Sequence, residues 1–243
     1  MTLLYRLELL RLLRDPTMLI SILFSPVVTC VLVADELVHQ PPGGLNSKTY
    51  VLVSMAAMGV VYAGLSGTAT AIAKDRTNGW YRQLAAGPSL GRGYLALRLL
   101  TVLPLCLLSA AGVLLIGSRL DGITISGAHL ASTVLALWLG STVYCVFGCA
   151  CGLVLDEKTV ALPVFVGIWG FDILGGLLWP VDTFPGWLQF PAKLTPTYHL
   201  GELAHQAQFG EAPGLLQILT LTGYLALGTV LLVLAHRRSR TRV

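Results

Sequence analysis

Residues 73–95 read AKDRTNGWYRQLAAGPSLGRGYL, a basic and polar stretch between two long apolar runs. The runs at 51–73 and 96–117 each suffice for a bilayer core of roughly 30 Å, which needs about 20 apolar residues in a helix. The stretch between them therefore predicts a connection at one membrane surface between two transmembrane helices.

The composition extends this interpretation to the whole chain. Of its 243 residues, 55% are hydrophobic and 12% are charged, and the mean hydropathy is +0.74. A soluble domain carries about 25% charged residues. Because backbone polar groups in lipid must bond internally, apolar runs without strict alternation predict helices rather than a β-barrel. We expect an all-α membrane protein of one domain, residues 1–243, whose six transmembrane helices lie at about 17–34, 51–73, 96–117, 128–155, 159–179 and 214–235.

The basic residues predict the orientation of the helices. With the N-terminus inside, the inner segments hold thirteen of the sixteen Lys and Arg residues. An excess of Lys and Arg marks cytoplasmic loops. We expect a multi-pass protein of the cell (inner) membrane with both termini and residues 74–95 in the cytoplasm. The net charge of +4 follows from this orientation, and without an aromatic-basic module it does not indicate nucleic acid.

Two segments outside the spans carry helix signals. Residues 1–15 begin MTLLYRLELLRLLR and suit an interfacial helix, which Pro16 separates from the first span. Residues 180–213 contain five prolines and predict short re-entrant helices, followed by a helix over about 197–209. Aromatic residues with the spacing of an outer interfacial belt are Trp179, Phe184, Trp187 and Phe190.

Small residues in two spans predict close helix packing. The second span carries Gly59, Gly64 and Gly67, and the fourth carries a G-x3-G at Gly148 and Gly152. Small residues let membrane helices approach closely. The sequence leaves open whether the contact lies within one chain or between two chains, and we prefer the former.

Few residues suit catalysis or metal binding. No H-E-x-x-H, G-x-S-x-G or pair of intramembrane carboxylates occurs. His199, Glu202 and His205 stand at i, i+3 and i+6, which drifts around a helix and suits metal poorly, so we expect a solvated interfacial face. The C-x3-C-x-C at 145–151 matches no standard metal spacing and indicates small packing residues. We expect no catalytic residue, metal or cofactor in this chain.

Asp172 is the one acid well inside a predicted span, in VFVGIWGFDILGGLLWP. An intramembrane acid is by default a functional hypothesis. Gly175 and Gly176 follow it and are expected to break the helix and admit water to the carboxyl group. Two interpretations stay open: a substrate pathway or gating role, and a hydrated structural cap near the outer mouth.

The stretch at 74–95 also carries signals for a short helix. Gly79 permits a turn, WYRQLAA favours a helix, and Gly87-Pro88-Ser89 ends it and starts the next helix. We expect a helix over about 77–86, lying across the cytoplasmic face. It is either a plain inside-facing charged loop or an element that transmits force from a soluble partner.

The pattern K-D-R-x-x-G-x-x-x-x-L-x-x-x-P, from Lys74 to Pro88, resembles the cytoplasmic loop of type-2 ATP-binding-cassette permeases. That family shows an acid-Arg pair, then Gly, Leu and Pro at this spacing, followed by a Tyr and a basic residue, where this chain has Tyr94 and Arg98. Further matches are the R-D-P at 14–16 and, before the last span, P-x-W-L with a later P-x-x-Y. The chain departs from the family at Lys74, where an acid is usual.

The resemblance implies a permease domain that works as a dimer, with a homodimer preferred over a heterodimer. Two copies of a separate cytoplasmic ATPase would bind ATP and Mg²⁺, so this chain is not expected to be an enzyme. Residues implied in ATPase coupling are Arg11, Arg14, Asp75, Arg76, Gly79, Arg82, Leu84 and Pro88. Residues suggested for a substrate pathway are Asp172, Trp179 and Tyr198.

The expected function is export of a hydrophobic or amphipathic small molecule, such as a drug or antibiotic, which would make the chain part of a multidrug efflux or antibiotic resistance system. Export of a polysaccharide or glycolipid, or of haem, is the nearest alternative. A secondary carrier and a polytopic membrane enzyme are less favoured, because a proton-coupled carrier needs more intramembrane acids than this chain offers.

Overall fold

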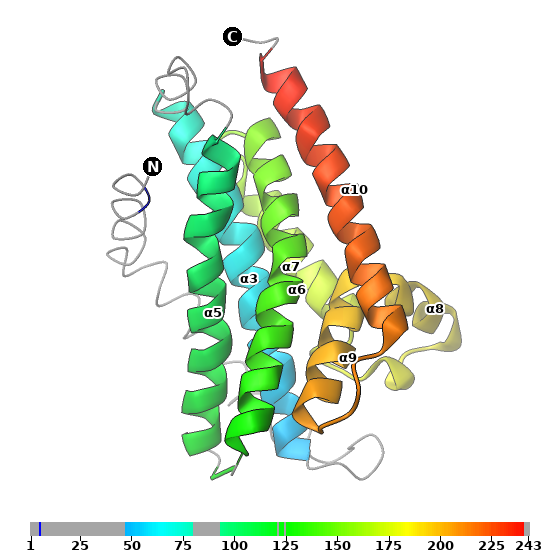
Figure 1. Ribbon diagram of the computed structural model, residues 1–243. Helices are drawn as coiled ribbons and strands as arrows, with labels where there is room; N and C mark the ends of the chain where they lie inside the picture. The colour runs from blue at the N-terminus through cyan, green and yellow to red at the C-terminus, as the bar shows by residue number, and fades with distance from the viewer. Residues whose placement is uncertain (1–4, 6–46, 80–92, 121, 124, 241–243) are drawn as a thin grey trace.

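The computed structural model describes residues 5, 47–79, 93–120, 122–123 and 125–240, and the regular structure within them is helical (Figure 1). The predicted first span at 17–34 lies outside the described residues. So do the interfacial helix at 1–15, apart from Tyr5, and all of the predicted helix at 77–86 beyond residue 79.

In the part of the chain that the structure describes, four helices are long and apolar enough to cross a membrane: α3 (Ser47–Thr77), α5 (Tyr94–Leu120), α6 (Gly127–Val154) and α10 (Leu215–Arg240). They coincide with four of the six predicted spans. The most apolar window of α3 is 89% buried and that of α10 is 22% buried. α3 is therefore the central helix of the bundle, and α10 lies at its edge (Figure 1).

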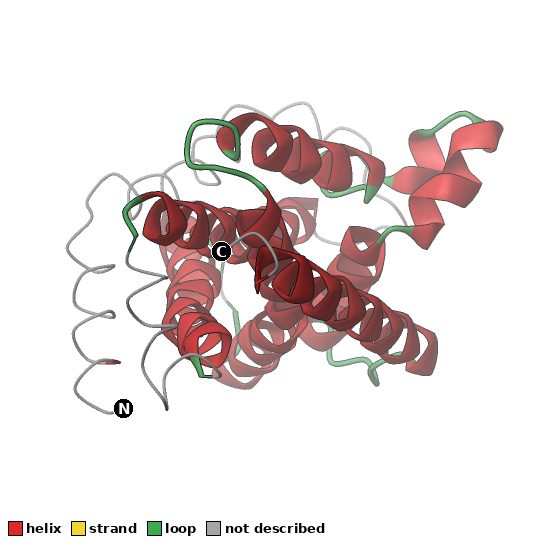
Figure 2. Cartoon of the chain, turned by 90° about the horizontal axis from the view of Figure 1, so that it is seen from above, coloured by secondary structure: helices red, strands yellow, loops and turns green. Residues whose placement is uncertain are grey.

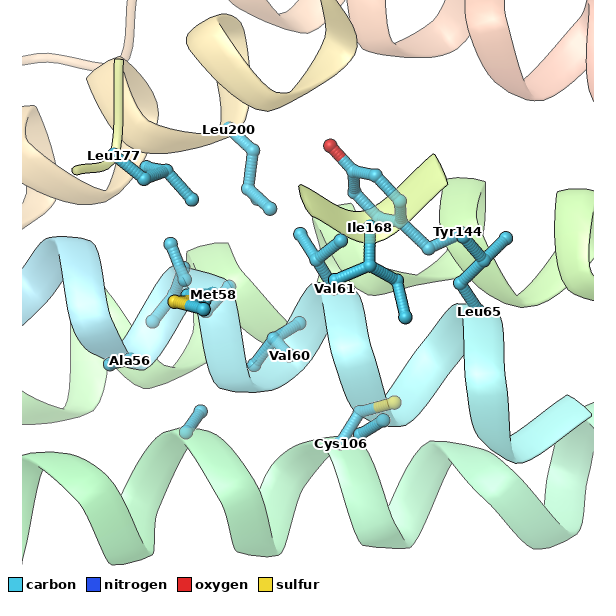
Figure 3. Close-up of a cluster of buried hydrophobic side chains, with 14 of the residues drawn as sticks. Ala56, Met58, Val60, Val61, Leu65, Cys106, Tyr144, Ile168, Leu177 and Leu200 are labelled. Atoms are coloured by element: carbon cyan, nitrogen blue, oxygen red, sulfur yellow. The ribbon is translucent and has the colours of Figure 1, made fainter. Parts of the chain in front are cut away.

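The core forms where other helices meet α3. Figure 3 shows Val61 and Leu65 of α3 close to Tyr144 of α6 and to Ile168 of α7 (Ala161–Leu174). Cys106 of α5 lies on the opposite side of α3. Side chains that stay exposed on the outer helices are largely leucine, such as Leu100, Leu139 and Leu231. An apolar exterior of this kind suits contact with lipid or with another membrane protein.

Glycines of α6 let it lie directly against α3. A Cβ placed on Gly148 would come within 2.5 Å of the Leu65 carbonyl oxygen, and one on Gly152 within 2.6 Å of the Ala69 carbonyl oxygen. Real Cβ contacts are not this short, so only glycine fits. The predicted close packing is confirmed, and at these two glycines it lies within one chain.

α7 (Ala161–Leu174) is shorter than the span expected at 159–179. Its 14 residues cover about 21 Å at 1.5 Å per residue, less than the roughly 30 Å of a bilayer core. The helix ends because Gly176 has a φ of +77°, a conformation that side chains oppose. The glycine pair breaks the helix as predicted, and the rest of the expected span is turn.

Three short helices connect α7 to α10: η2 (Val181–Thr183), α8 (Gly186–Leu194) and α9 (Pro196–Gln208). Thr195 caps α9 by accepting a hydrogen bond from the Tyr198 N–H, and Pro196 occupies the first turn. Figures 1 and 2 both place α8 at the side of the bundle.

The helix predicted at 197–209 is found as α9, which packs against α3, α6, α7 and α10.

α7 and α9 follow one another along α3. A Cβ placed on Gly167 of α7 would lie 3.8 Å from the side chain of Leu65 in α3. Ser54, three turns earlier on α3, contacts His205 of α9. Two short helices thus cover one side of the central helix, and the chain between them turns about halfway along the bundle (Figure 1).

Candidate functional site

The C-terminal end of α3, which is expected to face the cytoplasm, holds a buried ion pair. Asp75 of α3 is 3% exposed and pairs with Arg98 of α5, which is 4% exposed. The Tyr94 hydroxyl donates a hydrogen bond of 2.7 Å to the same carboxylate. Buried charges persist when they are paired and hydrogen-bonded. This pair therefore fastens α3 to α5.

Arg76, the next residue, fastens α3 to α6. Its Nη1 donates hydrogen bonds of 3.2 Å to the carbonyl oxygens of Gly152 and Leu155. The last carbonyls of a helix have no partner within the helix and carry partial negative charge, so a guanidinium stabilises them. We call Asp75, Arg76, Tyr94 and Arg98 the α3 joint.

Of the residues implied in ATPase coupling, the structure describes three. Asp75 and Arg76 belong to the α3 joint, where the Asp75 carboxylate contacts Tyr94 and Arg98 of α5. Gly79 follows α3 with a φ of +75°, and no atom of the described residues lies within 4 Å of a Cβ placed there. Arg11, Arg14, Arg82, Leu84 and Pro88 lie outside the described residues. A coupling role for all eight stays a prediction.

Asp172 of α7 is fully buried, and neither of its carboxylate oxygens has a hydrogen-bond partner in the described part of the chain. The expectation that water reaches this carboxyl group is therefore wrong, and so is the hydrated form of the structural cap, which was one of the two interpretations left open. The reason is α9: a Cβ placed on Gly175 would lie 2.6 Å from the Thr197 Cβ, so α9 closes over this end of α7. Thr197 in turn is hydrogen-bonded to the Tyr144 hydroxyl at 2.8 Å.

A cavity of about 220 Å³ lies beside the other face of α9, between the start of α3 and the turn after α7. Polar residues that line it are Tyr50, Asp182, Tyr198, Glu202, His205, Gln206 and Glu211. Trp179 is exposed and is not part of the lining. The structure thus does not gather Asp172, Trp179 and Tyr198 in one cavity.

His205 forms part of the cavity wall. Its ring stacks on Tyr50 with centroids 3.9 Å apart, and its Nε2 lies 3.2 Å from the Ser54 Oγ. Burial lowers the pKa of His205 to about 3, so the ring is neutral at neutral pH. The solvated face expected for His199 and His205 is wrong, because both are buried where α9 packs into the bundle.

The carboxylates at this cavity lie close enough to influence one another. Burial raises the pKa of Glu202, the negative charges of Asp182 and Glu211 raise it further, and Lys193 lowers it. Glu202 is partly buried, and the other two acids are exposed at the rim. The cavity is therefore lined by acidic side chains next to the aromatic rings of Tyr50 and Tyr198. Among the described residues no group of three His, Cys, Asp or Glu side chains is arranged to hold a metal ion.

A second and larger cavity, of about 680 Å³, lies between α6, α9 and α10. Its wall is mostly apolar and includes Leu139, Val143, Leu221 and Leu225. The volume falls within the range of roughly 300–1,000 Å³ that is typical of small-molecule sites. Sequence reasoning could not find either cavity, because both depend on how α9 packs.

Comparison with known families agrees with this architecture. The family model described as "ABC-2 family transporter protein" matches residues 34–236, which include every helix from α3 to α9 and most of α10. No curated protein sequence gives a match to the chain. With most of its length matched and its long apolar helices packed as a bundle, the chain belongs to the ABC-2 transporter family and is the multi-pass membrane permease component of an ATP-binding-cassette transporter.

Proposed function

We propose that this permease is the membrane subunit of an exporter that moves a hydrophobic or amphipathic small molecule, such as a drug or antibiotic, out of the cell. Two copies of a separate cytoplasmic ATPase hydrolyse ATP with Mg²⁺, and two copies of the permease form the transport dimer. This chain supplies the path along which the substrate crosses the membrane, and it binds no cofactor. Its cytoplasmic surface, with both termini, is the surface that receives the ATPase.

The α3 joint carries this proposal. Residues 80–92 connect the end of α3 to the start of α5, and they contain the segment that resembles a coupling helix. Because Asp75 pairs with Arg98 of α5 and Arg76 bonds to the end of α6, α3 cannot be displaced here without moving its neighbours. Force applied to this connection would therefore reach three packed helices together.

The apolar cavity between α6, α9 and α10 supports the class of substrate. Its lining suits a hydrophobic or amphipathic molecule of small size. A polysaccharide, the nearest alternative, would need many hydrogen-bonding groups along its route. The apolar lining therefore favours the small-molecule exporter.

Binding of the ATPase tests the proposal directly. We expect the wild-type permease in nanodiscs to retain the co-expressed ATPase in a pull-down, and a variant with Gly79→Pro and Leu84→Asp to retain about tenfold less. Proline cannot adopt the φ of +75° at Gly79. Aspartate at residue 84 would add a charge to the proposed contact.

The matched control is Gly122→Pro, which makes the same backbone change at a φ of +65°, between α5 and α6 at the opposite end of the bundle. It should retain the ATPase. A folded wild-type permease that retains no ATPase would refute the proposal and favour the carrier and enzyme alternatives.

Asp172→Asn tests the substrate pathway. Asp172 lines neither cavity in this structure, so it can act on the substrate only in another state of the bundle, in which its carboxyl group ionises. The amide keeps the shape of the side chain but cannot ionise in that state, so we expect transport to fall about tenfold while ATPase turnover is unchanged. Export from proteoliposomes and phosphate release are measured on the same preparation. Glu157→Gln, an exposed acid between α6 and α7, is the control. Unchanged transport would remove Asp172 from the pathway.

A further inference from the structure

The two cavities lie on opposite faces of α9 and meet at the segment that follows it. Tyr198, Glu202 and His205 point to the smaller cavity, whereas Leu203 and Ala207 point to the larger one. Glu211, just after α9, lines both. A molecule in the apolar cavity can therefore reach a carboxylate at its end.

The charges of this region favour a cation. The smaller cavity is lined by Asp182, Glu202 and Glu211, and the larger cavity has Glu211 as its acid. No lysine or arginine is part of either lining among the described residues. The ring of Tyr198, and the face of Tyr50 that is not stacked on His205, add aromatic surface on which an organic cation can be stabilised.

The sizes assign each part of the ligand to one cavity. The apolar space of about 680 Å³ accommodates a drug-sized body, whereas the acidic space of about 220 Å³ accommodates a small charged group. An anion would place its charge among three carboxylates, and a neutral molecule could only donate hydrogen bonds to them, without the attraction between opposite charges. The arrangement therefore selects for a molecule that is apolar at one end and positively charged at the other.

We infer that the cavities on the two faces of α9 form one binding site for an amphipathic organic cation, whose apolar body lies between α6, α9 and α10 and whose charge lies at Glu211 and Glu202. This inference rests on the proposed function, because it names the class of molecule that the exporter carries. It does not depend on the ATPase, and its test uses the permease alone.

The test compares two amphipathic ions of nearly the same shape and opposite charge, decyltrimethylphosphonium and decyltrimethylborate, each with an apolar chain at one end and a small charged group at the other. Each is radiolabelled and bound at equilibrium to the full-length permease in nanodiscs, and binding to empty nanodiscs is subtracted. We expect saturable binding of the phosphonium, about tenfold tighter than that of the borate. Equal binding of the two ions, tighter binding of the borate, or no saturable binding would overturn the inference.

Variants locate the site. Glu211→Gln and Glu202→Gln should each weaken phosphonium binding by about threefold to tenfold and leave borate binding unchanged or stronger. Glu157→Gln is the control for loss of an acid elsewhere. Ala136→Trp should fill the apolar cavity and abolish binding, whereas Ala226→Trp on the exposed side of α10 should not. Full phosphonium binding by both glutamine variants would overturn the assignment of the charged end, even if the tryptophan variants fail to fold.

If the phosphonium does not bind but the ATPase pull-down succeeds, the exporter proposal stands and the cation site does not. If the phosphonium binds but no ATPase is retained, the site stands and the ATP-driven mechanism does not.

Discussion

Gly148→Val is expected to prevent α3 from packing on α6. The new Cβ would meet the Leu65 carbonyl oxygen and the Thr68 Oγ1. Neither can withdraw, since Leu65 O is part of the helix backbone and Thr68 Oγ1 donates to the carbonyls of Gly64 and Cys145 at 2.7 and 3.1 Å. Overpacking costs about 1–3 kcal/mol where neighbours can move, so we expect a loss above this range.

The loss is measured as the midpoint of thermal unfolding in detergent and as the monodisperse fraction after extraction. Gly223→Val in α10 is the control, because nothing lies within 4 Å of a Cβ placed there. An unchanged midpoint for Gly148→Val, with the variant correctly inserted, would show that the close contact between α3 and α6 is not needed for stability.

Asp75→Ala is expected to destabilise the α3 joint. The buried Arg98 guanidinium loses its carboxylate and the Tyr94 hydroxyl loses its acceptor. Removal of one partner from a buried ion pair typically costs about 3–5 kcal/mol. Chemical unfolding in detergent should show this loss, together with reduced ATPase stimulation by substrate in the assembled transporter.

Lys74→Ala on the same turn is the matched control, since Lys74 is exposed and should change stability by about 0.5 kcal/mol or less. A double variant, Asp75→Leu with Arg98→Met, should regain most of the lost stability because it removes both charges. A double variant as unstable as Asp75→Ala would indicate that the ion pair itself is not the source of the effect.

The sequence predicted the long helices well because the constraint is simple. A bilayer core of roughly 30 Å requires about 20 apolar residues, and the four runs found as α3, α5, α6 and α10 meet it. The same count of apolar residues wrongly predicted one continuous helix over 159–179. Hydropathy treats Gly175 and Gly176 as neutral residues, whereas the φ of +77° at Gly176 ends α7 after 14 residues.

The site was predicted less completely because it depends on which face of a helix is covered. Lys74, Asp75 and Arg76 are adjacent, yet only Asp75 is fully buried. A usable signal existed: Tyr94 and Arg98, at i and i+4, share one face of α5, where both meet Asp75. His199 and His205 were misjudged because polar residues on a short helix suggest water, and only the packing of α9 shows otherwise.

The division of one side of the bundle between α7 and α9 bears on how the chain is made. As α7 leaves the ribosome and reaches the insertion machinery, its 14 residues are too few to cross the bilayer unaided. The turn that follows has backbone groups that lipid cannot satisfy, and α9, which covers it, is synthesised later. This side of the bundle is thus completed only while the last quarter of the chain is being translated, and a nascent chain that stalls before α9 carries an unfinished bundle for quality control to recognise.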